Sequence, residues 1–84
     1  MDAATRTLER QAVGQPNCAR LLVALGRTSR DWRGKGLGII LDNGWTLPVG
    51  SLYPLFDGSG WAILTTLGTG LRVDDPRISE VFRA

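Results

Sequence analysis

The chain has 84 residues, of which 43% are hydrophobic and 21% are charged, and its formal net charge at pH 7 is +2. This size and composition are typical of a single globular domain, so we expect one domain over residues 1–84. Histidine is absent and Cys18 is the only cysteine, which excludes an internal disulfide, a cysteine–histidine zinc site and a histidine base. No apolar run approaches the length of a membrane helix and no signal peptide opens the chain, so we expect a cytoplasmic protein, in the host cytoplasm if a phage encodes it.

The N-terminal residues predict a short first helix. Ala4, Leu8 and Ala12 recur every four residues, which places them on one face of a helix over residues 4–13. The following Gly14-Gln15-Pro16 would end this helix, because proline cannot continue the helical hydrogen bonds.

A second helix is predicted directly afterwards. Asn17 is a favourable N-terminal cap, and Gly26 is typical of a residue that ends a helix. The apolar stripe of this helix consists of Cys18, Leu21, Leu22 and Leu25. Because Cys18 falls on the stripe, we expect it to be a small core residue and not a nucleophile.

From residue 37 the pattern changes to strands. Two apolar runs, 39–41 and 45–47, flank Asn43-Gly44, which predicts a β-hairpin with a type I′ turn and positive φ at both central residues. Pro48 and Pro54 are expected to interrupt the next segment, leaving residues 51–56 as a short helical turn or an irregular strand.

A second hairpin is predicted further along. Residues 57–60 are expected to form a turn, 61–67 a strand, and 71–73 its return strand. Trp45 and Trp61 each begin an alternating segment, so we expect both side chains in the core or on a sheet face.

The C-terminal residues predict a third helix. Asp74-Asp75-Pro76 fits a helix start, because aspartate caps the first turn and proline is tolerated there. The expected fold is therefore α+β, with a small antiparallel sheet of three to five strands, two N-terminal helices and a C-terminal helix, and with helices covering one face of the sheet. The predicted core consists of Leu21, Leu22, Leu25, Ile39, Leu41, Ile63, Ile78, Val81 and Phe82.

Arg33, Gly36 and Gly38 form an R-x-x-G-x-G pattern. The pattern resembles the loop with which acetyltransferases of the GNAT superfamily bind the pyrophosphate of coenzyme A at a helix N-terminus. Here the chain reaches Asn43-Gly44 within five residues, too soon for the helix that this resemblance implies. We therefore expect no coenzyme A site and no other cofactor.

Residues 49–63 resemble part of the PadR-type winged-helix regulators. Gly50-Ser51-Leu52-Tyr53-Pro54 is similar to the start of their recognition helix, and Gly60-Trp61 is similar to the turn into the wing. The resemblance implies a DNA-binding regulator with residues 61–73 as the wing. Residues 55–59, which would continue the recognition helix, contain no cation, so this regulator remains the alternative function.

Residues 27–35 concentrate positive charge, with four basic residues and one acidic residue. Trp32 lies among these charges, where it is either a contact residue or a core residue. Arginine and tryptophan are enriched at binding hot spots. The predicted partner-binding residues are Arg27, Arg30, Trp32, Arg33 and Lys35.

The side chains favour binding over catalysis, because neither a histidine, a cysteine pair nor a paired carboxylate is available. In size and composition the chain resembles the anti-CRISPR proteins of phages and mobile elements, in particular those that attach to type I CRISPR surveillance complexes and block target DNA. This resemblance implies a non-enzymatic inhibitor that occludes a host protein or nucleoprotein complex. Direct nucleic-acid binding is the less favoured mode, and no membrane or small-molecule substrate is expected.

Overall fold

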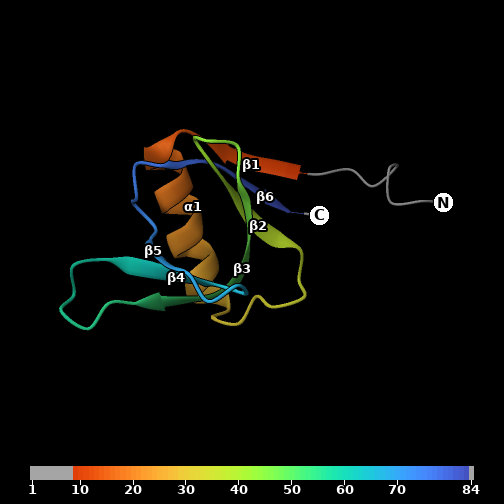
Figure 1. Ribbon diagram of the computed structural model, residues 1–84. Helices are drawn as coiled ribbons and strands as arrows, with labels where there is room; N and C mark the ends of the chain where they lie inside the picture. The colour runs from red at the N-terminus through yellow and green to blue at the C-terminus, as the bar shows by residue number, and fades with distance from the viewer. Residues whose placement is uncertain (1–8, 84) are drawn as a thin grey trace.

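The structure is a computed structural model that describes residues 9–83, which form one helix and a six-stranded antiparallel sheet (Figure 1). The helix α1 spans Gln15–Thr28. The strands are β1 (Glu9–Val13), β2 (Leu37–Leu41), β3 (Thr46–Pro54), β4 (Trp61–Thr65), β5 (Gly70–Arg72) and β6 (Ile78–Arg83). Their order across the sheet is β1-β6-β2-β3-β4-β5, so β2 to β5 form a meander and β6 returns between β1 and β2.

Strand β3 joins the two halves of the sheet. Its first residues pair with β2, and residues 49–54 pair with β4. The register shifts between Val49 and Ser51, and a Cβ on the intervening Gly50 would lie 3.0 Å from the carbonyl oxygen of Leu64. This close approach at an irregular point of the strand is typical of a β-bulge, which bends the sheet.

The helix packs against one face of this bent sheet, where it contacts β1, β3 and β6. Figure 1 shows α1 beside strands from both halves. The fully buried side chains between them are Cys18, Leu22, Ile39, Val49, Leu52, Ile63, Ile78 and Val81. The predicted Leu21, Leu25 and Phe82 are only partly buried, and Trp45, expected in the core or on a sheet face, is 66% exposed.

The predicted first helix is wrong over residues 9–13, which form strand β1; residues 4–8 lie outside the described part of the chain. Strand β1 pairs with β6, with Ala12 opposite Val81. Gly14 then turns the chain at φ +88°, and its N–H donates to the carbonyl of Ser79 at 3.0 Å. Pairing with a strand from the far end of the chain therefore overrides a weak helical spacing.

The predicted second helix exists, but both of its predicted ends are wrong. Pro16 lies in the first turn of α1 and does not end a preceding helix, as its fixed φ and missing N–H allow. Asn17 is not the cap, and its Nδ2 donates to the carbonyl of Val13 at 3.3 Å. Gly26 lies inside the helix, where a Cβ would stand 2.7 Å from the Trp61 ring. This glycine permits close packing of helix on strand.

The predicted C-terminal helix is also wrong, because Ile78–Arg83 forms strand β6. Leu41 lies opposite Ile78 and Ile40 lies opposite Glu80, so β6 carries an extra residue at this point. The bulge places Ile78 and Val81, three residues apart, in the core together. Their spacing therefore imitates a helical face. With one helix and six strands, the expected fold of three helices and three to five strands is overturned.

The segment that resembles a recognition helix is extended. Residues 50–54 belong to β3, and residues 55–60 form the turn into β4. The predicted turn at 57–60 is confirmed, as are strands at 61–65 and 70–72. A winged-helix interpretation of this segment is wrong, since no helix is present here to enter a DNA groove.

The Asp75–Arg77 ion pair holds the turn that replaces the expected helix start. Arg77 Nη2 lies 2.8 Å from Asp75 Oδ2, and the Arg77 backbone N–H donates to Asp75 Oδ1 at 2.9 Å. The side-chain hydrogen bond from Arg77 lowers the pKa of Asp75 from its usual 3.8.

A lowered native-state pKa stabilises the fold above the unfolded pKa and ceases to do so as the pH falls through the native value. We therefore expect Asp75→Asn to lower the melting temperature at pH 7. The melting temperature of this variant should also fall less than that of the parent protein when the pH drops below about 4. Arg77 is solvent-exposed, so the effect should stay under about 1 kcal/mol. Thermal melts between neutral and acid pH measure it, and parallel curves for both proteins would contradict the assignment.

The predicted β2–β3 hairpin is confirmed, but its turn is not type I′. Gly44 has φ +88°, whereas Asn43 does not have positive φ. The Leu41 N–H donates to the carbonyl of Trp45 at 2.8 Å, and the Gly44 N–H donates to that of Leu41 at 2.9 Å. These bonds enclose a three-residue loop, residues 42–44, whose last residue has a left-handed backbone conformation.

Replacing Gly44 with valine should cost more than about 1 kcal/mol of unfolding free energy, because a β-branched residue resists positive φ. The space around a Gly44 Cβ is open, so the cost comes from the backbone alone. Gly70→Val is the matched control, since Gly70 has an uncrowded Cβ position without positive φ. Urea denaturation of the two variants compares them, and equal stabilities would show that the turn is assigned wrongly.

Candidate functional site

The basic segment that follows α1 is fixed on strand β3. The Trp32 N–H donates to the carbonyl of Gly50 at 2.8 Å, and the Leu52 N–H donates to that of Arg30 at 2.9 Å. Asp31 forms an antiparallel bridge with Ser51. Residues 30–32 therefore act as a short extra strand beside β3, and this backbone pairing holds the neighbouring side chains in place.

The buried side chain of Trp32 fixes this segment to the core. Its side chain is 7% exposed, and its Nε1–H donates to the carbonyl of Ser29 at 2.6 Å. Lys35 Nζ and the Arg83 guanidinium carbon lie 5.6 and 5.5 Å from the ring centroid. Both distances permit a cation–π attraction. Of the two roles considered for Trp32, the structure shows the core role.

The cations around Trp32 point outward. Arg30, Arg33 and Lys35 are all exposed. Arg33 Nε lies 3.5 Å from Asp31 Oδ1, and the Arg33 backbone N–H donates to the same oxygen at 3.1 Å. This backbone hydrogen bond, followed by the positive charge of Arg33, lowers the pKa of Asp31. Arg30 and Lys35 make no ion pair within residues 9–83.

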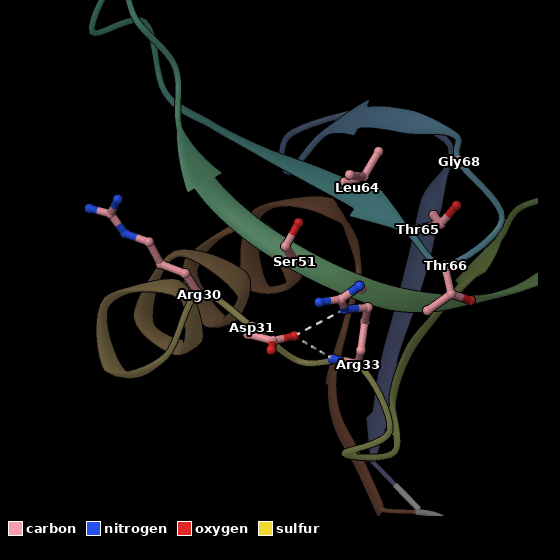
Figure 2. A pocket seen from close by; sticks show the side chains of 9 residues that line it. Arg30, Asp31, Arg33, Ser51, Leu64, Thr65, Thr66 and Gly68 are labelled. Atoms are coloured by element: carbon pink, nitrogen blue, oxygen red, sulfur yellow. Dashed lines mark hydrogen bonds and ion pairs between the residues drawn. The ribbon is translucent and has the colours of Figure 1, made fainter.

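An open depression of about 580 Å³ lies between this segment and β4. Figure 2 shows the guanidinium of Arg33 above β3, between Ser51 and Thr66, whereas Arg30, which also lines the depression, extends in another direction from the end of the helix. Leu64, which lies opposite Ser51 in the sheet, forms part of the lining. The lining therefore combines two arginines, the carboxylate of Asp31, three hydroxyl side chains and one apolar side chain on a solvent-open surface.

The apolar part of this surface continues along the β3–β4 hairpin. The outer face is the side of β3 and β4 that faces away from α1. It carries Ser51, its partner Leu64, and Tyr53. We include Phe56 of the adjoining turn, because it lines one hollow together with Tyr53. Tyr53 and Leu64 are 38% and 42% exposed, and Phe56 is fully exposed. Such a run of exposed large apolar side chains beside arginines is typical of an interaction surface.

The structure separates Arg27 from the other predicted contact residues. Arg30, Arg33 and Lys35 share the segment after the helix, whereas Arg27 lies in the last turn of α1 and lines a different hollow together with Arg20. Tyr53, Phe56 and Leu64 were not among the predicted contacts. Residues 61–64 are all apolar, so the sequence contains no signal that singles out Leu64 as an outward-facing side chain.

The glycine-rich turn at residues 33–36 leads into strand β2. Gly34 and Gly36 have positive φ, as a tight turn requires. The helix N-terminus on which the acetyltransferase resemblance depends is therefore replaced by a strand, and the turn does not have the geometry of that pyrophosphate loop.

Cys18 lies in the core, as predicted. It is fully buried, and burial followed by the negative charge of Glu80 raises the pKa of its thiol. Its Sγ–H donates to the carbonyl of Ala12 at 3.7 Å. The thiol is therefore protonated at neutral pH and packs as a small apolar group.

Within the described residues, no group of three or more acidic or cysteine side chains is placed to hold a metal ion. The described helix is too short to cross a lipid bilayer. Comparisons of the chain with protein-family models, with curated proteins and with solved structures find no match.

Proposed function

We propose that this protein is a small non-enzymatic inhibitor that docks on a host macromolecular complex through the outer face and the basic segment beside it. The observation that carries this proposal is that exposed Leu64 lines one depression with Arg30 and Arg33. Tyr53 shares the sheet face of Leu64 and lines a neighbouring hollow together with Phe56. Large apolar side chains supply binding energy when they are desolvated, and arginines at the edge supply orientation.

The backbone of this surface is organised before binding. Residues 30–32 are hydrogen-bonded to β3, and Trp32 anchors them in the core. Holding the contact residues in place lowers the entropy lost on association. Arginine forms bidentate hydrogen bonds with carboxylates, so the complementary partner surface is an apolar hollow edged by acidic side chains. Inhibition would follow from steric occlusion of whatever normally binds there.

The first partners to test are type I CRISPR surveillance complexes, because the chain resembles their inhibitors in size and composition. We expect the purified protein to prevent at least one such complex from binding its target duplex. Tyr53→Ala combined with Phe56→Ala should weaken this inhibition by at least about tenfold, since the variant removes two exposed anchors. Trp45→Ala is the control, because Trp45 is also an exposed aromatic residue but lies at the β2–β3 turn. A gel-shift or fluorescence-anisotropy titration of target binding measures both.

Failure of the protein to affect any complex of a representative panel would overturn the anti-CRISPR proposal. Equal inhibition by the double variant and by the parent protein would overturn the outer face as the contact surface. Weaker inhibition by Trp45→Ala alone would place the contact at the β2–β3 turn instead.

Direct nucleic-acid binding is tested separately by titrating a non-specific duplex at increasing salt concentration. We expect no measurable binding at physiological salt, because the basic segment offers few cations and one of them is paired with Asp31. Binding whose logarithm falls with the logarithm of salt at about −0.9 per phosphate contact would contradict the proposal and favour a nucleic-acid partner.

A further inference from the structure

A second hollow lies on the opposite side of the sheet, beside α1. It has a volume of about 390 Å³ and is lined on the helix by Ala19, Val23 and Ala24 and on the sheet by Trp61 and Val73. We call it the helix groove. Trp61 and Val73 are held together by the Val73 N–H, which donates to the carbonyl of Trp61 at 3.0 Å. The helix groove therefore has an apolar floor, and it runs where the sheet ends against the helix.

The sheet ends beside this groove with strand β5, which pairs only with β4 among the described strands. Residues 69 and 73 bond to β4 through their backbone. In an antiparallel pair the intervening residues direct their N–H and C=O groups away from the partner strand. Gly70 and Arg72 therefore face the open edge, where the Arg72 carbonyl accepts the Asp75 N–H at 3.1 Å. Both groups of Gly70 and the N–H of Arg72 can pair with another strand.

The charge at the groove is positive. Arg20 and Arg27 line it from two turns of α1, and neither makes an ion pair within the described chain. The single acidic residue of the lining, Asp74, is bound to Arg72 with an Nε–Oδ1 distance of 2.9 Å. Two arginines thus remain for carboxylates of a bound molecule.

We propose that the helix groove binds an extended acidic segment of a partner protein, which adds as a strand alongside β5. Alternate side chains of an added strand point to opposite faces. Apolar side chains on one face would cover Val23 and Trp61, and glutamates or aspartates next to them would reach Arg20 and Arg27. Backbone pairing with a sheet edge supplies affinity in such complexes, and the side-chain pockets supply specificity.

This proposal is independent of the outer face, because the two surfaces lie on opposite sides of the sheet. Its test is a titration of the ¹⁵N-labelled protein with a short acetylated peptide of alternating valine and glutamate. We expect amide shifts concentrated at Gly70 and Arg72 and a shift of the Trp61 indole signal. A peptide with lysine in place of glutamate should not bind, since it would meet two unpaired arginines.

Two charge-reversal variants complete the test. Arg20→Glu combined with Arg27→Glu should weaken binding of the glutamate peptide by at least about tenfold. Arg30→Glu combined with Arg33→Glu makes the same change of charge away from the groove and should leave peptide binding unchanged. Absence of shifts, shifts centred on Tyr53 and Leu64, or equal binding of the lysine peptide would each overturn the proposal. An inhibitor that docks by the outer face would remain unaffected by any of these results.

Discussion

Replacing Trp32 with alanine is expected to lower the free energy of unfolding by about 3–5 kcal/mol, the usual cost of truncating a large buried aromatic side chain. The ring is 7% exposed and its Nε1–H bonds to the carbonyl of Ser29. Its removal would leave a cavity beneath residues 30–32 and would loosen their pairing with β3. In so small a domain, a loss of this size leaves a large unfolded fraction.

Trp45→Ala is the matched control, because the same side chain is removed from a position that is 66% exposed. Its cost should stay within about 0.5 kcal/mol, as for other surface substitutions. Chemical denaturation followed by circular dichroism measures both variants. Comparable stabilities would mean that Trp32 does not anchor the basic segment, and that this segment is not held in place for binding. Because Trp32 is structural, charge changes at Arg30 and Arg33 test the contact surface without disturbing the core.

Leu22→Ala is expected to cost about 2–5 kcal/mol, as truncations of buried leucine do. Leu22 is fully buried where α1 packs on the sheet, together with Cys18, Ile39 and Val81. Leu67→Ala is its control, because Leu67 is 69% exposed in the turn after β4. A loss below about 0.5 kcal/mol at Leu22 would mean that this face of α1 does not form the core.

Elements stabilised by nearby residues could be predicted from the sequence. The Asn43-Gly44 hairpin, the turn at 57–60 and the strands around it follow from local turn chemistry. The apolar stripe of α1 also predicted its buried face, where Cys18 and Leu22 are fully buried. In these segments, interactions between residues that are close in the sequence are enough to determine the structure.

Strands β1 and β6 could not be predicted in this way, because each depends on pairing with a distant segment. Val81 lies opposite both Ala12 and Ile39 in the sheet. A register shift near Ser79 then gives β6 the three-residue spacing of a helix. The place of Gly26 could not be predicted for a similar reason, since only the distant Trp61 ring explains a glycine inside the helix.

The candidate site was predicted in part. Arg30, Arg33 and Lys35, which the sequence analysis names as partner contacts, are exposed on one segment. The location of Trp32 could not be derived, because it depends on hydrogen bonds between residues 30–32 and β3. Strand β3 contains two prolines, and the sequence analysis expected them to interrupt it. Because the continuous strand was not predicted, the outer face with Tyr53 was not predicted either.

The affinity of charge-reversed variants for the inhibited complex tests the central claim most directly. Arg30→Glu with Arg33→Glu and Arg20→Glu with Arg27→Glu alter the net charge equally, but on opposite sides of the sheet. We predict that the first pair weakens binding of the complex by at least about tenfold and makes association slower, because it reverses the charge beside the outer face. The second pair should bind the complex as the parent protein does. Unchanged binding by the Arg30–Arg33 variant, or equal losses for both variants, would contradict docking through the outer face.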